Sequence, residues 1–136
     1  MYYGAMTSRT IDPARQALIE AYIDAYNRFD IEGMLAVLSD DVRFEHHSAG
    51  EISVATDGKA ELGKLARVGA TMFASRHQSI VALDEEGDTV VATVDFHGEI
   101  AEDIPDGPRA GTVIEMRGSS EFGFAGGRIC RVVDKA

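Results

Sequence analysis

The sequence predicts an α+β domain, with helices mainly in the first half of the chain and an antiparallel sheet mainly in the second half. Apolar residues recur at helical spacing between residues 13 and 73. They then alternate with polar residues over 89–100 and 112–124, which is the pattern of strands with one buried face. Helices followed by a run of strands are typical of α+β domains rather than βαβ folds.

Three helices are expected. Asp12 before Pro13 starts the first, because the Asp side chain can accept from the first free amides and Pro has no amide to leave unpaired. This helix ends near Arg28, Asp30 caps a short second helix, and a third opens around 56–58. The inner face of the first helix carries Ile19, Tyr22, Ile23 and Tyr26. Those of the second and third helices carry Met34, Leu35, Val37 and Leu38, then Leu62, Leu65, Ala66, Gly69, Met72 and Phe73.

Strands and turns alternate in the rest of the chain. We expect the strands at 42–47, 77–83, 89–100, 112–124 and 128–134. Segments rich in Gly, Pro and Asp connect them at 84–88, 101–111 and 126–127. A curved sheet with the helices packed on its concave face would enclose a cone-shaped space, and such cavities are usually apolar with a few polar groups.

Length and composition fit one domain of 136 residues, 45% of them hydrophobic and 26% charged. We expect this domain over 12–136, preceded by an N-terminal extension, 1–11. The formal net charge of −10 opposes nucleic-acid binding, because a phosphate backbone requires clustered cations. No segment approaches the ~20 apolar residues of a membrane helix, and the first six residues lack a secretion signal. Cys130 has no partner for a disulfide, so a cytoplasmic protein is expected.

The alternation that defines the strands also assigns polar side chains to the apolar face. His46 shares its face with the apolar residues two and four positions before it, whereas His47 points to the other side. Ser120 lies on the apolar side of its strand, and Tyr22 belongs to the buried stripe of the first helix. The facing of Asp134 stays open, because apolar residues precede it on both faces.

This set supports proton abstraction next to a carbonyl group. His46 would take the proton, Tyr22 would donate to the developing oxyanion, Ser120 would add a weaker donor, and Asp134 would orient the imidazole. Three of these residues also have a structural explanation. His46 and Tyr22 fit hydrogen-bonded core residues, and Ser120 fits a small residue where the sheet bends.

Neither a metal site nor a cofactor is expected. Adjacent strand residues point to opposite faces, so His46 and His47 cannot chelate one ion, and no spacing of His, Cys or Glu suits a metal. Glycine-rich phosphate loops and nucleophile elbows are missing from the sequence. The polar face of the long strands, with Asp95, Glu115 and Arg117, suits a solvated surface or a wet dimer interface.

Four segments carry a resemblance to a known family: 22–30, 38–44, 56–59 and 122–129. In their order and spacing the chain resembles the nuclear transport factor 2-like superfamily, and within it the SnoaL-like and ketosteroid isomerase-like group. The resemblance covers about residues 12 to 136. It implies a cone-shaped, cystatin-like α+β barrel with three helices on the concave face of the sheet. It also implies an internal pocket and a homodimer packed through the sheet.

The resemblance further implies roles for single residues. The oxyanion-binding tyrosine of steroid isomerases falls on Tyr22 and matches. The catalytic aspartate falls on His46, the protonated aspartic acid of the oxyanion hole on Ser120, and a supporting tyrosine on Ala66, and these three differ. Because one oxyanion donor is worth about 3–4 kcal/mol of transition-state stabilisation, a steroid isomerase in the strict sense is not expected. The resemblance permits a different base with the same geometry, His46 in place of the carboxylate.

We therefore expect a protein that binds a small hydrophobic molecule in an internal pocket, with or without turnover. Acid–base activity of the isomerase, dehydratase or cyclase type would depend on His46, Tyr22 and Asp134. The alternative is a non-catalytic interaction domain whose pocket is filled by its own side chains. The residues expected to line the pocket are Tyr26, Phe44, Met72, Phe96, Met116, Ser120 and Phe122.

Overall fold

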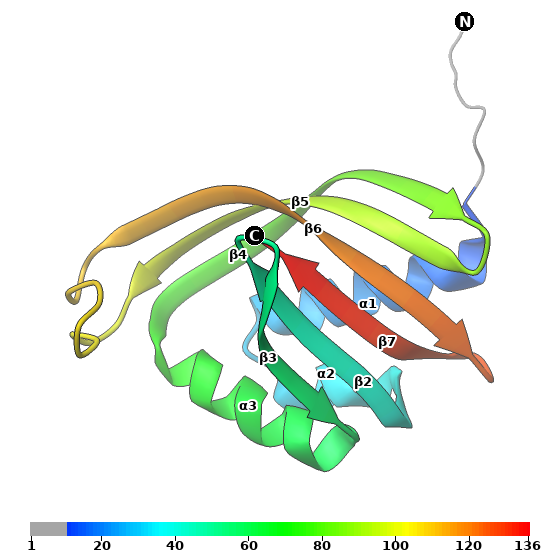
Figure 1. The fold of residues 1–136 in the computed structure, drawn as a ribbon, viewed down its shortest axis with the longest axis horizontal. Coiled ribbons are helices and arrows are strands. Elements are labelled where there is room, and N and C mark those ends of the chain that lie inside the picture. Colours follow the sequence, from blue (N-terminus) through cyan, green and yellow to red (C-terminus); the bar gives the residue numbers. More distant parts are fainter. Residues whose placement is uncertain (1–10) are drawn as a thin grey trace, which may run out of the picture.

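The computed structural model describes residues 11–136, and within them three helices cover one face of a six-stranded sheet (Figure 1). The helices are α1 (Pro13–Asn27), α2 (Ile31–Ala36) and α3 (Lys59–Thr71). The strands are β2 (Leu38–Ser48), β3 (Glu51–Asp57), β4 (Phe73–Glu86), β5 (Thr89–Ile100), β6 (Val113–Ala125) and β7 (Arg128–Lys135). The predicted α+β class is confirmed. The expected N-terminal extension lies outside the described residues, apart from Ile11.

The sheet is curved and does not close. Its strand order is β3-β2-β7-β6-β5-β4, which leaves β3 and β4 as edges. All neighbouring pairs are antiparallel except β2 and β7, which run parallel. The sheet bends over the side that carries the helices (Figure 1). The predicted helix-covered concave face is therefore present, but the sheet is mixed and forms an open arch.

Both predicted helix caps are present. The Asp12 carboxylate accepts from the amide of Ala14 at 3.0 Å, and the Asp30 carboxylate accepts from the amide of Gly33 at 2.9 Å. The second helix is shorter than expected, because Leu38 begins strand β2 and pairs with Ile129 of β7. Pairing with the sheet thus replaces a final helical turn. None of the helices in residues 11–136 is long and apolar enough to cross a membrane.

The strands follow the alternation, with two differences. β2 and β4 extend beyond 42–47 and 77–83, and β3 was not expected. β3 is an edge strand whose residues from Glu51 to Ala55 are all exposed, so burial imposes no alternation on its sequence. The predicted hairpin at 126–127 is confirmed, and both glycines have positive φ, as the tight turn requires.

The hydrophobic core is one cluster that packs α1, α2 and α3 against the sheet. Between α1 and the adjoining halves of β5, β6 and β7, Ile19, Val90, Phe122, Ile129 and Val132 are almost completely buried. The other halves of these strands, with the end of β2, surround a cavity instead. The fold thus keeps a packed end for stability and an open end where polar groups gather.

Candidate functional site

The concave side of the sheet holds a cavity with two adjoining lobes. The helix-side lobe, about 230 Å³, is lined by apolar side chains of the helices, together with Tyr22 and Arg76. The strand-side lobe, about 330 Å³, is lined mainly by β5, β6 and the end of β7. The two lobes share Tyr26, His46, Phe73, Gln78 and Asp134. These five residues therefore mark the junction between the lobes.

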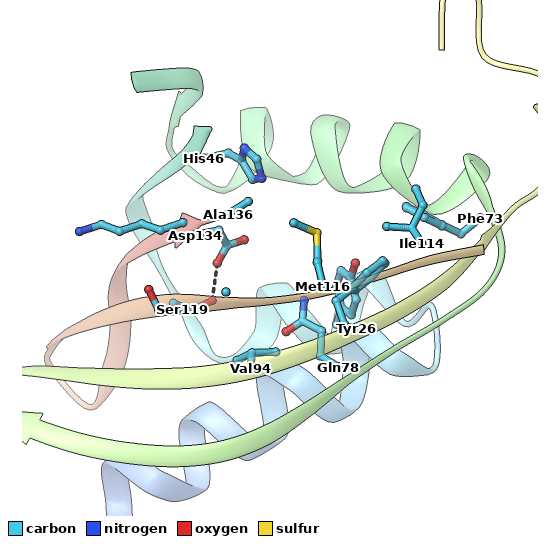
Figure 2. A pocket seen from close by; sticks show the side chains of 14 residues that line it. Tyr26, His46, Phe73, Gln78, Val94, Ile114, Met116, Ser119, Asp134 and Ala136 are labelled. Carbon is cyan, nitrogen blue, oxygen red and sulfur yellow. Dashed lines mark hydrogen bonds between the residues drawn. The ribbon is translucent and has the colours of Figure 1, made fainter. Parts of the chain in front are cut away.

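Three of the polar residues expected in the site lie in one row across the sheet. His46 of β2 is the register partner of Asp134 of β7, and Asp134 is the register partner of Ser120 of β6. Register partners on neighbouring strands point to the same face and lie about 5 Å apart. Figure 2 shows His46 and Asp134 converging on the strand-side lobe with Tyr26, Gln78 and Met116.

The Asp134 carboxylate is hydrogen-bonded to Ser120 and not to His46. The Ser120 hydroxyl donates to its carboxylate at 2.6 Å (dashed line in Figure 2). Loss of water contact raises the pKa of the Asp134 carboxyl, while the Ser120 hydrogen bond and the nearby His46 oppose that rise. Asp134 was expected to orient the imidazole, but the described residues show no direct hydrogen bond between Asp134 and His46. The group is a carboxyl that takes up a proton more readily than an exposed aspartate.

The His46 ring is oriented from the other side by Ser53 of β3. The Ser53 hydroxyl donates to the His46 carbonyl at 3.0 Å, and its oxygen lies 3.0 Å from Nδ1 of the ring. Since the hydroxyl proton is already used, the Ser53 oxygen accepts from Nδ1–H in the neutral ring. Nε2 is then the nitrogen with a free lone pair, which a general base requires.

Two tyrosines of α1 lie against the cavity. Burial holds the pKa of the Tyr22 phenol far above its usual value, and the Asp134 carboxylate adds to the rise. Burial also raises the pKa of Tyr26, while the Arg76 guanidinium opposes the rise. Tyr22 packs edge-on against Phe122, with ring centroids 5.9 Å apart. Both phenols therefore remain protonated at neutral pH and are available as hydrogen-bond donors.

Arg76 and Gln78 of β4 were missed in the sequence. Both face the cavity, and Arg76 is only 7% exposed. The backbone of Gln78 exchanges two hydrogen bonds with the Asn27 side chain, which fixes the end of α1 against β4. The sequence did indicate their facing, because residues 76, 78 and 80 alternate along the strand and Ile80 packs against the core. The predicted strand began at residue 77, so Arg76 fell outside it.

Most of the predicted lining residues border the cavity. Tyr22 and Phe44 line the helix-side lobe, and Phe96, Met116 and Ser120 line the strand-side lobe. The junction contains Tyr26, His46 and Asp134. Two residues lie elsewhere: Met72 caps the end of α3 with 38% of its surface exposed, and Phe122 is 1% exposed within the core. Met72 belonged to the inner side of the predicted third helix, but the helix ends just before it.

A metal site is missing from the part of the chain that the structure describes, since no three His, Cys, Asp or Glu side chains cluster there. Ser120, expected as a free donor, uses its proton on Asp134. The polar groups that border the cavity include the His46 imidazole, the Asp134 carboxyl, the two phenols, the Gln78 amide and the Arg76 guanidinium. This set can move protons and stabilise negative charge.

Comparison with known families decides the family. The model of the SnoaL-like domain matches residues 19–132. The chain belongs to the SnoaL-like domain family. The family resemblance predicted from the four sequence segments is thereby confirmed. A search of curated protein sequences finds no significant match for this SnoaL-like domain.

Solved structures share the fold of this SnoaL-like domain. A protein of Xanthomonas campestris pv. campestris, proposed to be a polyketide cyclase, is 25% identical with a TM-score of 0.72, and the match covers 90% of each chain. A proposed SnoaL-like polyketide cyclase of Jannaschia sp. CCS1 is 15% identical with a TM-score of 0.79, covering 93% of this chain and 90% of the other. An LEH-like epoxide hydrolase of M. tuberculosis is 17% identical with a TM-score of 0.70, covering 90% and 81%.

Proposed function

We propose that this SnoaL-like domain is an acid–base enzyme that acts on a small, mostly apolar molecule with a carbonyl group. The observation that carries the proposal is the pairing of His46 with Asp134 at the junction of the two lobes. A base with a free lone pair lies beside a carboxyl whose pKa is raised by burial. Two proton-exchanging groups with different environments are the usual arrangement of an acid–base site.

The reaction begins with the imidazole. Nε2 of His46 takes a proton from the carbon next to the carbonyl, and the electron pair of the broken C–H bond moves toward the carbonyl oxygen. The protonated phenol of Tyr22 donates a hydrogen bond to the enolate oxygen. The proton then returns to the same carbon or to a conjugated one, from His46 or from protonated Asp134. Return to a different carbon gives an isomerase. Attack of the enolate carbon on a second carbonyl breaks its C=O π bond and gives an alkoxide, which takes the proton from His46, and this is a cyclase reaction.

The walls of the cavity support an apolar substrate. Met34, Phe44 and Leu62 line the helix-side lobe, and Phe96 and Met116 line the strand-side lobe. The relative from Xanthomonas campestris pv. campestris is proposed to be a polyketide cyclase. Polyketides carry several carbonyl groups, and the proposed reaction requires one. Nothing in residues 11–136 favours the alternative of an interaction domain whose pocket is filled by its own side chains.

The test is deuterium exchange from solvent into small apolar ketones such as 2-tetralone, followed by mass spectrometry. His46→Gln should slow the enzyme-dependent exchange by about 10²–10⁴-fold, the usual contribution of a general base. His47→Gln is the matched control, because the neighbouring imidazole bonds to Glu45 at 2.8 Å instead of lining the cavity. Unchanged exchange in His46→Gln, or equal losses in both variants, would refute the proposal.

A further inference from the structure

Arg76 is a buried cation that the acid–base reaction does not use. Its guanidinium stacks on the rings of Tyr26 and Phe29, with the central carbon 3.7 Å and 4.4 Å from the ring centroids. Nε donates to the Tyr26 carbonyl at 3.1 Å. Nη2 is buried and has no hydrogen-bond partner among the described residues. The side chain therefore has one fixed donor and one buried donor left unpaired.

The charge of Arg76 is not neutralised within residues 11–136. The ion pairs found there do not include Arg76. The Asp134 carboxyl also lines the helix-side lobe, but its hydrogen bond goes to Ser120. A buried charge with an unpaired donor is costly, and the cost is recovered when an anion arrives. The two aromatic rings hold the guanidinium plane in place, so little rotamer freedom is lost on binding.

We infer that Arg76 binds a carboxylate of the ligand in the helix-side lobe. This inference rests on the proposed function, because it names the substrate class of the same cavity. A planar guanidinium matches a carboxylate, and charge-assisted hydrogen bonds are about twice as strong as neutral ones. A phosphate carries up to two negative charges, whereas Arg76 is the one Lys or Arg among the described residues that line this lobe, so a singly charged carboxylate matches it better. The ligand is thus an apolar acid.

The position of Arg76 also determines how the ligand lies relative to His46 and Asp134. Arg76 lines only the helix-side lobe, whereas His46 and Asp134 line both lobes. A ligand anchored by its carboxylate at Arg76 extends past this pair toward Phe96 and Met116. The carbon that loses its proton then lies between the carboxylate and the apolar far end of the molecule, and the carbonyl next to it is a second group, separate from the acid.

The test compares probes of nearly the same shape, of which one carries a negative charge and the other is neutral. Calorimetric titration with 2-naphthoate and 2-naphthamide, and with the smaller pair benzoate and benzamide, measures the preference for the carboxylate. The wild-type protein should bind the acid of at least one pair about tenfold more tightly or better, as expected for a hydrogen bond between charged groups. Arg76→Met should reduce this ratio to near one, Arg76→Lys should retain part of it, and Arg117→Met on the exposed face should leave it unchanged.

Several outcomes overturn the inference. Equal binding of acid and amide by the wild-type protein, no binding of either acid at millimolar concentration, or an unchanged ratio in Arg76→Met would each do so. If Arg76→Met does not fold, the wild-type ratio and Arg76→Lys still decide. His46→Gln separates the two proposals: it should slow ketone exchange while keeping the preference for naphthoate over naphthamide. Ketone exchange by a protein that does not prefer the carboxylate probe refutes only the role of Arg76. Preference for the carboxylate probe without any ketone exchange refutes only the acid–base function.

Discussion

Burial of the Asp134 carboxyl, which serves the proposed reaction, reduces the stability of the folded protein at neutral pH. Its carboxyl is desolvated by the cavity walls, and one hydroxyl and one imidazole compensate only in part, so its pKa lies above the ordinary value. The folded chain therefore holds this proton more tightly than the unfolded chain does. The contribution of Asp134 to stability is largest below the unfolded pKa of about 3.9. It falls as the pH rises toward the raised folded pKa, and it is fully lost at a pH above the folded pKa.

Asp134→Asn should therefore stabilise the protein at neutral pH. The amide oxygen still accepts from Ser120, but no charge is buried, and a gain on the order of 1 kcal/mol is typical of such a change. Thermal unfolding followed by circular dichroism should show a higher Tm at pH 7, and the gain should shrink as the pH falls toward about 4.

Glu121→Gln on neighbouring β6 is the control with the opposite sign. The hydrogen bond from Lys135 at 2.6 Å holds the pKa of the Glu121 carboxyl below its usual value. Glu121 therefore contributes stability above its unfolded pKa that is lost as the pH falls through its lowered folded pKa. Removing its charge should lower Tm at pH 7. A lower Tm for Asp134→Asn, or a gain independent of pH, would contradict this account.

At the scale of elements, the end of β7 sets the position of the site. Gly118 of β6 lies directly against the backbone carbonyl of Lys135, and a Cβ at this position would overlap that carbonyl. The backbone of a paired strand cannot move aside as a flexible side chain can. The glycine thus allows β6 and the end of β7 to approach closely, which keeps Asp134 in the row with His46 and Ser120.

Gly118→Ala should consequently damage both stability and activity. We expect a loss of about 1–3 kcal/mol in the free energy of unfolding, as for other overpacked positions, measured by urea denaturation. Ketone exchange should fall as well, because displaced β7 moves Asp134. Gly69→Ala is the control: nothing lies within 4 Å of its Cβ position, and alanine in a helix should stabilise by up to about 1 kcal/mol. Full exchange activity in Gly118→Ala would refute the argument.

The elements also explain what the sequence could predict. Strict alternation located β5 and β6 and placed Ser120 on the buried face, and the same parity placed His46 beside the cavity. The facing of Asp134 stayed open, because it depends on the parallel pairing of β2 with β7, residues far apart in the chain. Arg76 was missed because the start of β4 carries polar residues, and its burial comes from the aromatic rings of α1 and the following turn.

At the scale of the whole molecule, the surface charge opposes the ligand that the cavity prefers. The chain carries a formal net charge of −10, whereas Arg76 presents a buried cation in the helix-side lobe. An approaching carboxylate is first repelled over tens of ångströms and then held at short range. Salt screens these two interactions unequally, because exposed charges are screened and buried contacts much less so.

The association rate of 2-naphthoate should therefore increase with salt. The Debye length falls from about 30 Å at 0.01 M to about 8 Å at 0.15 M ionic strength, which removes most of the long-range repulsion. Stopped-flow measurements should show a severalfold rise in the association rate and little change in the dissociation rate, since the contact with Arg76 is buried. The neutral 2-naphthamide should show neither effect. An association rate that falls with salt would mean that cations near the entrance attract the anion, and a dissociation rate that rises steeply would mean that the carboxylate stays in water and does not reach Arg76.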